Sequence, residues 1–393
     1  MKTSRQFFSF GVRIAFVYSL LYFFVSHYEF YQDFVIWATQ HLFNYQEKLF
    51  TENFGSGDRT FDYFNIATSM FTAVAAGSVW AVLDRNRDNT TAVLNWFVLY
   101  LRISLGLVMI SYGVSKIYPS QFPAPSLIRL METFGNTSPM RLLWTFMGAS
   151  PVYSMFGGAA ELAGGILLFL PYFWYLGALI IMGVMANVFA LNVAYDVPVK
   201  SFSLSLFLAA AIVVLSRAPA LFNFFVLGRA ARLDLEPGYF KRRILNYSMI
   251  AVQILILCWF VRMDFLGAHY RVKPRAEVPM RGIWYVQNAT GVKMFPWTHI
   301  IFDIPEVAVV KFRDGHTEYL MFKEFVENSS LVLGKKSEPW EAVFFIEHAG
   351  AEFMTFKTTW EGHPLELDLH KVDDSQFSLK STGFHFIQER TPR

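Results

Sequence analysis

The sequence predicts an α-helical polytopic membrane bundle of about seven transmembrane helices, followed by a C-terminal antiparallel β domain. Three observations lead to this fold class. Hydrophobic residues make up 54% of the 393 residues and aromatic residues 18%, which exceeds the composition of ordinary soluble domains. Charged residues make up 17% and gather in the chain ends and loops. After about residue 275, long apolar segments give way to short alternating runs separated by Gly, Pro, Asn and Asp.

Seven apolar segments predict the helices of the bundle, since about 20 apolar residues are needed to cross a bilayer. The expected spans are residues 7–27, 61–83, 92–117, 151–170, 174–195, 201–215 and 244–261. The first has no small-residue cleavage site, so we expect it to be retained rather than removed as a signal peptide. Arg13 lies near the inner end of this span, where its long side chain can extend to the lipid head groups.

Two loops contain shorter helical segments. An interfacial helix is expected around residues 34–43, within an aromatic and acidic loop. The connection between the third and fourth spans contains an amphipathic stretch at 126–134 and then Ser138-Pro139, a pattern typical of a helix N-terminus. These helical pieces are too short to cross a bilayer. We therefore expect the two pieces in the connection between the third and fourth spans to lie in or near the membrane interface.

Basic residues predict the orientation of the bundle. With seven spans, the N-terminus, the Arg85/Arg87 turn and the basic stretch 217–243 share one side, which the positive-inside rule makes cytoplasmic. The C-terminal domain then lies outside, whereas six spans would place it inside. The net charge of +3 is small and topology explains the basic residues, so no nucleic-acid partner is expected.

The chain therefore divides into four parts. Residues 1–90 hold the first two transmembrane helices and an outer loop, and residues 91–217 form a four-helix core. Residues 218–270 hold a basic cytoplasmic loop and the seventh helix, and residues 271–393 form the extracytoplasmic β domain. About eight or more short strands predict a sandwich or barrel there. Gly282-Ile-Trp284 resembles the GxW element that opens lipocalin barrels, whose interior is either filled by side chains or holds one small ligand.

Two charges lie inside the four-helix core, where charge is costly and usually has a partner and a purpose. Arg102 and Glu161 lie roughly at mid-depth of the third and fourth spans, which predicts an intramembrane polar pair that locks the two helices together. Small residues surround Glu161 on its own helix: Gly157, Gly158, Gly164 and Gly165. Such residues permit close helix packing, and they can equally leave room for a flat ligand head.

A second group of polar residues is expected near the outer membrane surface. It consists of Tyr112, Lys116, Asn192, Asp196 and Lys200, with Asn187 and Tyr195 in supporting positions. A carboxylate, two ammonium groups and a phenol can bind an anionic or carbonyl-bearing head group, or relay protons. The alternative interpretation is that these are ordinary charges that extend to the interface. No residue is assigned a catalytic role.

Several chemistries are disfavoured by the sequence. None of the nine histidines lies in the interior of a predicted span, which argues against bis-histidine haem in the membrane. Cys258 is the single cysteine, so the chain forms no internal disulfide and no thiol redox pair. There is no HExxH, GxGxxG, P-loop or GxSxG motif. We therefore expect no metal site.

A series of segments in residues 101–215 carries a family likeness. They are Leu101-Arg-Ile, Tyr112-Gly-Val-Ser-Lys-Ile, Gln121-Phe-Pro, Leu143 to Pro151, the glycine-rich stretch around Glu161, and Asn187 to Lys200. In these segments the chain resembles the DoxX family of bacterial membrane proteins, and its full arrangement is similar to the long DoxX-like proteins of Bacteroidetes-type bacteria. The resemblance implies a four-helix DoxX-like core made of the third to sixth spans. It also implies a multi-pass protein of the bacterial inner membrane, with a cytoplasmic N-terminus and a periplasmic C-terminal domain.

Two hypotheses for function follow. Some DoxX relatives are subunits of thiosulfate:quinone oxidoreductase or are tied to membrane redox complexes. The first hypothesis is therefore an accessory component of a membrane redox system that binds a quinone, a lipid or a similar lipophilic ligand and acts with a periplasmic or membrane redox partner. The alternative is a membrane-anchored binding or scaffold protein whose outer β domain recruits a partner or ligand, with no catalysis of its own.

Overall fold

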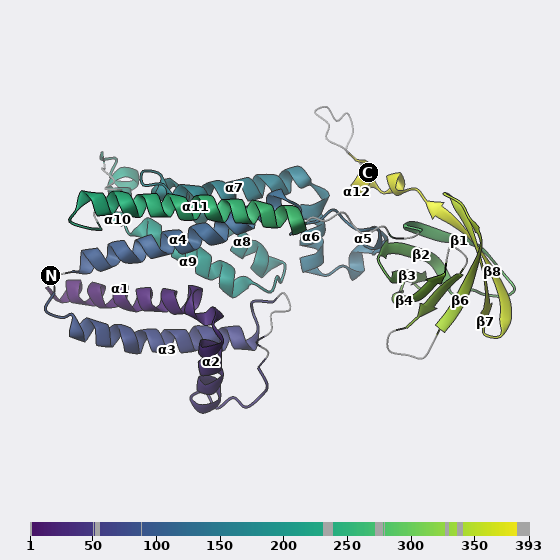
Figure 1. Cartoon of the computed structure of the whole chain (residues 1–393), viewed down its shortest axis with the longest axis horizontal. Coiled ribbons are helices and arrows are strands. Elements are labelled where there is room, and N and C mark those ends of the chain that lie inside the picture. Colours follow the sequence, from purple (N-terminus) through teal and green to yellow (C-terminus); the bar gives the residue numbers. More distant parts are fainter. Residues whose placement is uncertain are drawn as a thin grey trace. The chain divides into compact units, whose positions relative to one another are not determined.

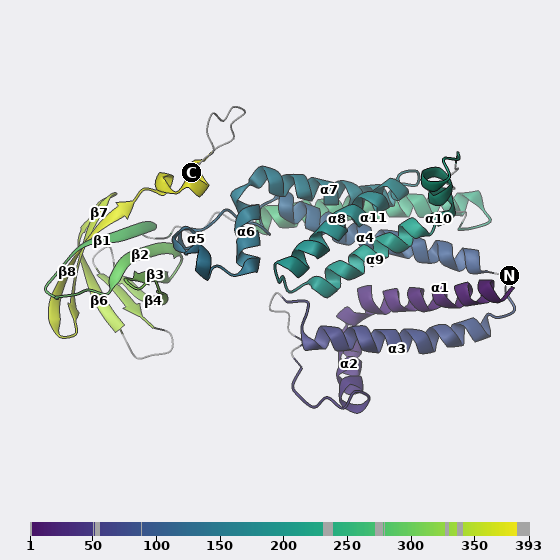
Figure 2. The same ribbon diagram turned by 180° about the vertical axis from the view of Figure 1, so that it is seen from behind.

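The computed structural model describes residues 2–49, 51, 56–87, 89–230, 239–271, 278, 280–326, 330–335 and 341–382 (Figures 1 and 2). Packing divides the chain into two compact units. The helical unit comprises Met1–Phe122 and Pro151–Val272, and the β unit comprises Pro123–Ser150 and Lys273–Arg393. The connection Pro123–Ser150, which the sequence analysis assigned to the four-helix core, thus groups with the β domain.

The helical unit consists of helices of unequal length. They are α1 (Lys2–Phe23), η1 (Val25–His27), α2 (Glu29–His41), α3 (Thr60–Leu83), α4 (Thr90–Ile117), α7 (Pro151–Phe169), α8 (Trp174–Ala194), α9 (Lys200–Leu215), α10 (Ala218–Leu221), η3 (Phe222–Val226) and α11 (Arg243–Arg271). Figure 1 shows α2, the predicted interfacial helix, running across the direction of α1 and α3. The last helix is ten residues longer than predicted at its C-terminal end, which changes the role of Asp264 as described below.

Six helices in the described part of the chain are long and apolar enough to cross a membrane, namely α1, α3, α4, α7, α8 and α11. The remaining predicted span, the sixth, is α9, whose 16 residues extend about 24 Å, less than the hydrocarbon core of about 30 Å. It continues after a break into Ala218–Val226, bent by 72°, and counts as a span only together with that segment. The predicted fold class, a helical membrane bundle with a β domain, is confirmed.

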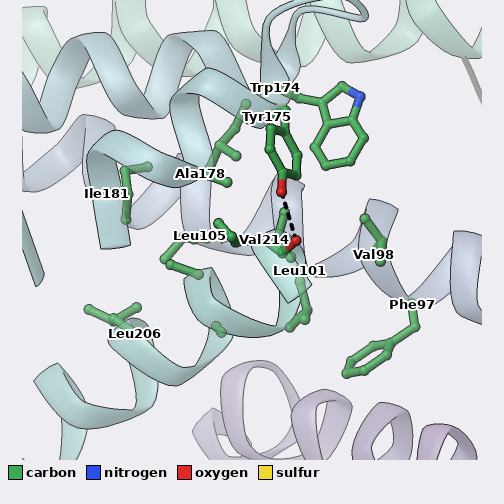
Figure 3. Packing of buried hydrophobic residues seen from close by; sticks show 14 of the residues in the cluster. Phe97, Val98, Leu101, Leu105, Trp174, Tyr175, Ala178, Ile181, Leu206 and Val214 are labelled. Atoms are coloured by element: carbon green, nitrogen blue, oxygen red, sulfur yellow. Dashed lines mark hydrogen bonds between the residues drawn. The ribbon is translucent and has the colours of Figure 1, made fainter. Parts of the chain in front are cut away.

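Helices α4, α7, α8 and α9 form the core of the helical unit. Bulky apolar residues of α4, α8 and α9 interdigitate there, including Leu101, Leu105, Ile181 and Leu206 (Figure 3). The hydroxyl of Tyr175 in α8 donates to the carbonyl of Val214 at 3.0 Å, which satisfies an acceptor near the C-terminal end of α9. Helices α1 and α3 pack on one side of this core and α11 packs on α4 and α7.

Glycines bring α4 and α7 unusually close together. Gly113 of α4 faces Gly158 of α7, and a Cβ atom built on Gly113 would lie 2.6 Å from the Gly158 carbonyl oxygen. Gly106 and Gly165 face each other in the same way, one heptad along the helices. Close packing is therefore the role of these glycines. Gly157 differs, because no heavy atom lies within 4 Å of the position of its Cβ.

Arg13 lies inside the helical unit instead of extending to lipid head groups. Its Nη2 atom lies 2.7 Å from Asp84 Oδ2 and 2.7 Å from Asn89 Oδ1, and both Arg13 and Asp84 are buried. The hydrogen bond from Arg13 holds the pKa of Asp84 below its ordinary value. The reason is geometric: the turn between α3 and α4 folds back over α1 and supplies a carboxylate at the depth of Arg13.

The β unit contains a closed antiparallel barrel in which each strand pairs with its neighbours and β1 pairs with β8. Its strands are β1 (Gly282–Thr290), β2 (Trp297–Ile304), β3 (Val307–Phe312), β4 (Thr317–Val326), β5 (Ser330–Gly334), β6 (Glu341–Ala349), β7 (Phe353–Trp360) and β8 (His363–Val372). A barrel, not a sandwich, is therefore present. Its interior is filled by side chains, among them Trp284, Trp297, Phe302, Phe344 and Phe356.

The amphipathic stretch predicted at 126–134 packs on the outer face of the barrel. Helix α5 (Leu127–Met131) covers Ile283, Ile301 and Val309, which alternate with the inward-facing residues of β1, β2 and β3. Asp303 accepts a hydrogen bond from the Leu127 backbone N–H at 2.8 Å. Helix α5 is thus partly buried against protein, and its expected location in the membrane interface stays a prediction. Helix α6 (Pro139–Ala149) follows α5 in the same unit.

The variant Gly158→Ala tests the close contact of α4 and α7. We expect it to destabilise the helical unit by about 1–3 kcal/mol, because the added methyl group has no room beside Gly113. The measurement is thermal unfolding of the purified protein in detergent, followed by circular dichroism. Gly157→Ala is the matched control, since its methyl group enters open space. Equal melting temperatures for the two variants would contradict this packing.

Candidate functional site

The contact of α4 and α7 places a charged pair inside the helical unit. Lys116 lies in the last turn of α4, and Glu161 lies in the middle of α7. The Lys116 Nζ atom forms a salt bridge with Glu161 Oε1. The two side chains are 8% and 1% exposed, so the pair is buried inside the helical unit. The pair was not predicted, although both residues were singled out from the sequence.

The second carboxylate oxygen of Glu161 has no donor. Oε2 is buried and makes no hydrogen bond within the described residues. Leaving a buried acceptor unpaired costs about 1–3 kcal/mol, and more for a charged group. Buried polar atoms in native proteins almost always have a partner, so Oε2 is a candidate position for a ligand; Arg13 Nε and Thr68 Oγ1 are the other buried side-chain atoms without a partner among the described residues.

Tyr112 completes a small polar cluster around this pair. It lies one turn before Lys116 on α4, and the Lys116 Nζ atom lies 5.7 Å from the centroid of its ring. Ser154 of α7 donates from its hydroxyl to the Lys116 carbonyl oxygen at 3.3 Å, which fixes the end of α4 against the start of α7. We name Tyr112, Lys116 and Glu161 the core polar site.

The surface of α7 has open space one turn before Glu161. Gly157 lies one helical turn before Glu161 and shares its face. It is half-buried, and the space where a side chain would begin is free of other atoms. At Gly164, one turn after Glu161, the same face is closed by Ile181 of α8. Open space therefore lies beside Gly157, one turn from the buried Glu161 side chain.

The predicted pairing of Arg102 with Glu161 is wrong. Arg102 donates to the Leu168 carbonyl oxygen from Nε at 3.0 Å and from Nη2 at 2.8 Å, and its guanidinium lies 4.8 Å from the Trp174 ring. It thus caps the C-terminal end of α7, where carbonyl groups have no partner within the helix. Arg102 also lies 3.5 Å from the Tyr239 hydroxyl through Nη1.

Helix register and side-chain direction explain this difference. Because Gly113 faces Gly158 and Gly106 faces Gly165, Glu161 is level with Ile110 on α4. Arg102 is eight residues from that level, about 12 Å along the helix. Side chains also tilt towards the N-terminus of their helix, which directs Lys116 towards Glu161 and Arg102 away from it.

The other residues predicted for the site form separate contacts. Asn192 donates from Nδ2 to Ser203 Oγ at 3.0 Å and joins α8 to α9. Lys200 Nζ lies 2.7 Å from Asp196 Oδ1, but Asp196 is 84% exposed, so this is a surface ion pair. Of the two supporting residues, Asn187 is exposed and Tyr195 is half-buried. The structure therefore brings Tyr112 and Lys116 together and leaves the remaining members at the ends of α8 and α9.

Two carboxylates with clear roles were missed by sequence reasoning. Asp58 accepts hydrogen bonds from the backbone N–H groups of Lys200 and Ser201 at 2.7 and 2.9 Å, which caps α9 from a distant loop. Asp264 of α11 accepts from the Ser111 hydroxyl at 2.7 Å and ties α11 to α4. Asp264 was placed beyond the last predicted span, which ended at residue 261. The described residues contain no group of three or more metal-ligating side chains.

The fold and the site define a class: a bundle of membrane-length apolar helices joined to a closed eight-stranded barrel, with a charged pair inside the bundle. The chain is 32% identical over 103 residues to "Uncharacterized protein YwoB" of Bacillus subtilis (strain 168). The match covers 26% of this chain and 64% of that relative, which is less than two thirds of its length. No family model matches the sequence, and no solved structure matches it.

Removing one member of the Lys116–Glu161 pair is expected to be costly. Lys116→Met or Glu161→Gln alone should lower the free energy of unfolding by about 3–5 kcal/mol, because the remaining charge stays buried and unpaired. The double variant should recover part of this loss. Denaturant unfolding in detergent gives the free energy of unfolding of the two single variants and the double variant. Asp196→Asn is the control, and its free energy of unfolding should change by about 1 kcal/mol or less. If the loss in the double variant equals the sum of the losses in Lys116→Met and Glu161→Gln, the two side chains do not interact and the pair is refuted.

Proposed function

We propose that this protein is a DoxX-type integral membrane protein whose helical unit binds the polar head of a small lipophilic molecule, a quinone or a similar ligand. It acts as an accessory component of a membrane redox system. The observation that carries this proposal is the core polar site, in which a buried carboxylate oxygen of Glu161 lacks a donor beside Lys116 and Tyr112.

The chemistry of the core polar site suits such a head group. Lys116 offers an ammonium donor, Tyr112 a phenol and Glu161 a carboxylate acceptor. The charges of Lys116 and Glu161 cancel, so the site favours a neutral head over an anion. Apolar residues surround the cluster on α4 and α7, as an apolar ring or chain requires. A charged pair in an apolar bundle is costly, and a ligand-binding role gives a reason for its presence.

The surface of α7 supports entry from a membrane. Val152 and Phe156 are among the most exposed apolar side chains of the helical unit, and both precede the open face at Gly157. An isoprenoid or acyl chain lies well against such residues. The head group then passes Gly157 to reach Glu161.

We place the protein in the bacterial inner membrane, with the N-terminus in the cytoplasm and the β unit in the periplasm. Arg85 and Arg87 follow α3, and Arg217, Lys241 and Arg242 lie in the segments between α9 and α11. The positive-inside rule favours a cytoplasmic location for these turns. The end of α4 that carries Lys116 then belongs to the periplasmic side, as does the entry past Gly157.

Small molecules extracted from the purified protein test this function. Mass spectrometry should detect a quinone in the wild-type protein and a strong loss, about tenfold or more, in Lys116→Met, because the ammonium donor is removed. Asp196→Asn is the matched control and should keep the wild-type content, since Asp196 pairs at the surface. Equal quinone content in Lys116→Met and wild type would place the ligand elsewhere.

A second candidate function rests on the outer face of the barrel. Four rings lie in a row across β2, β1, β8 and β7: His299, Tyr285, His370 and Phe353 are cross-strand neighbours in that order. The ring centroids of Tyr285 and His299 are 5.3 Å apart, and those of Phe353 and His370 are 4.6 Å apart. Burial, with Lys311 nearby, lowers the pKa of His299 and favours its neutral ring.

This outer ring row favours a scaffold role. Because side chains fill the barrel interior, recognition by the β unit falls to its outer surface. Aromatic side chains are enriched where proteins bind partners. In this hypothesis the helical unit is an anchor, and the β unit recruits a partner without catalysis of its own.

Substitution of the outer ring row tests the scaffold role. Tyr285→Ser combined with Phe353→Ser should reduce cross-linked partner proteins several-fold in intact cells, because two exposed aromatic anchors are lost. Tyr319→Ser is the control, since Tyr319 is an exposed tyrosine on β4 outside the row. Unchanged partner recovery in the double variant would remove support for this role. Ligand content of the helical unit should stay the same in all variants.

A further inference from the structure

The hydrogen-bond requirements of Glu161 restrict which head group the core polar site accepts. An ionised carboxylate only accepts hydrogen bonds. Oε1 accepts from Lys116, whereas Oε2 is buried and has no donor among the described residues. The group that satisfies Oε2 must therefore bring a hydrogen-bond donor with it.

The hydroxyl groups of two serines near the site have other partners. The Ser154 hydroxyl donates to the Lys116 carbonyl oxygen, and the Ser111 hydroxyl donates to Asp264. Tyr112 presents its ring face to the Lys116 ammonium. On the α8 side, Ile180 and Ile181 are the nearest side chains to Gly164, one turn from Glu161. None of these described contacts directs a donor at Oε2.

We infer that the core polar site selects a head group with a hydroxyl donor over the same ring with only carbonyl groups, that is, a hydroquinone over its quinone. This inference rests on the proposed function. A hydroquinone hydroxyl donates to Glu161 Oε2, whereas a quinone carbonyl directs a second acceptor at it. The preference rests on the salt bridge in which the Lys116 ammonium occupies Oε1 and leaves Oε2 as the acceptor.

The size of the preference follows from the energy of a hydrogen bond to a charged group. Such a bond is worth about 1.5–3 kcal/mol, so the hydroquinone should bind about ten- to a hundredfold more tightly. A binding preference of this direction stabilises the reduced form. It raises the midpoint potential of the bound two-electron couple by about 30 mV for each tenfold difference in affinity.

Binding of one ring system in both oxidation states tests the inference. The probes are decyl-benzoquinone and decyl-benzohydroquinone, the latter kept reduced with dithionite, added to the purified full-length protein in detergent. Tryptophan fluorescence quenching gives the two dissociation constants. The wild-type protein should bind the hydroquinone at least about tenfold more tightly. Equal affinities, or a preference for the quinone, would overturn the inference and leave the site itself in place.

Two sets of variants sharpen the result. Glu161→Gln, whose amide both donates and accepts, should bring the two affinities to within about threefold of each other. Gly157→Leu keeps the carboxylate and fills the open approach, so it should weaken both probes alike; Gly183→Leu on α8, which also has open space beside it, should weaken neither. If the wild-type protein binds neither probe, the proposed function fails together with this inference. If Glu161→Gln is unstable, the ratio of the two dissociation constants of the wild-type protein still tests the preference, and the comparison of Gly157→Leu with Gly183→Leu still tests the position of the site.

Discussion

The close contact between α4 and α7 sets the geometry of the whole helical unit. Two pairs of facing glycines let the helix backbones approach so closely that a methyl group at Gly113 or Gly158 would strike the opposite helix. This contact fixes the antiparallel register. The register in turn decides that Lys116 meets Glu161 and that Arg102 reaches the C-terminal end of α7. A shift of one helical turn would separate both sets of partners by about 5 Å.

Most charged groups discussed above bind at or near helix ends. Arg102 caps α7, Asp58 caps α9, and Arg13 joins the turn after α3 to α1. Each satisfies backbone groups or a charge where a helix begins or ends. Glu161 is different because it lies in the middle of α7, where the backbone needs no partner. Its free oxygen therefore cannot be explained by capping, which is why it carries the functional argument.

The fold was largely predictable and the pairing of charges was not. Apolar length gives the helices, and alternation gives the strands, because both are local patterns. The Arg102–Glu161 pairing failed because depth was counted from the middle of each span, whereas α4 has 28 residues and α7 only 19. The cap from Asp58 on α9 joins residues far apart in sequence, and no local pattern indicates it. Likewise, the apolar face of α5 suits a lipid surface or a barrel equally well.

The packing of α5 also bears on how the two proposed functions relate. The connection Pro123–Ser150 joins the helix that carries Lys116 to the helix that carries Glu161, yet its α5 helix belongs to the packed surface of the β unit. Asp303 binds both the start of α5 and Arg281, and Lys311 donates to the Met131 carbonyl oxygen at 2.9 Å. The β unit therefore contains a segment that is covalently continuous with both helices of the core polar site. Recruitment by the β unit and ligand binding by the helical unit are then compatible parts of one protein.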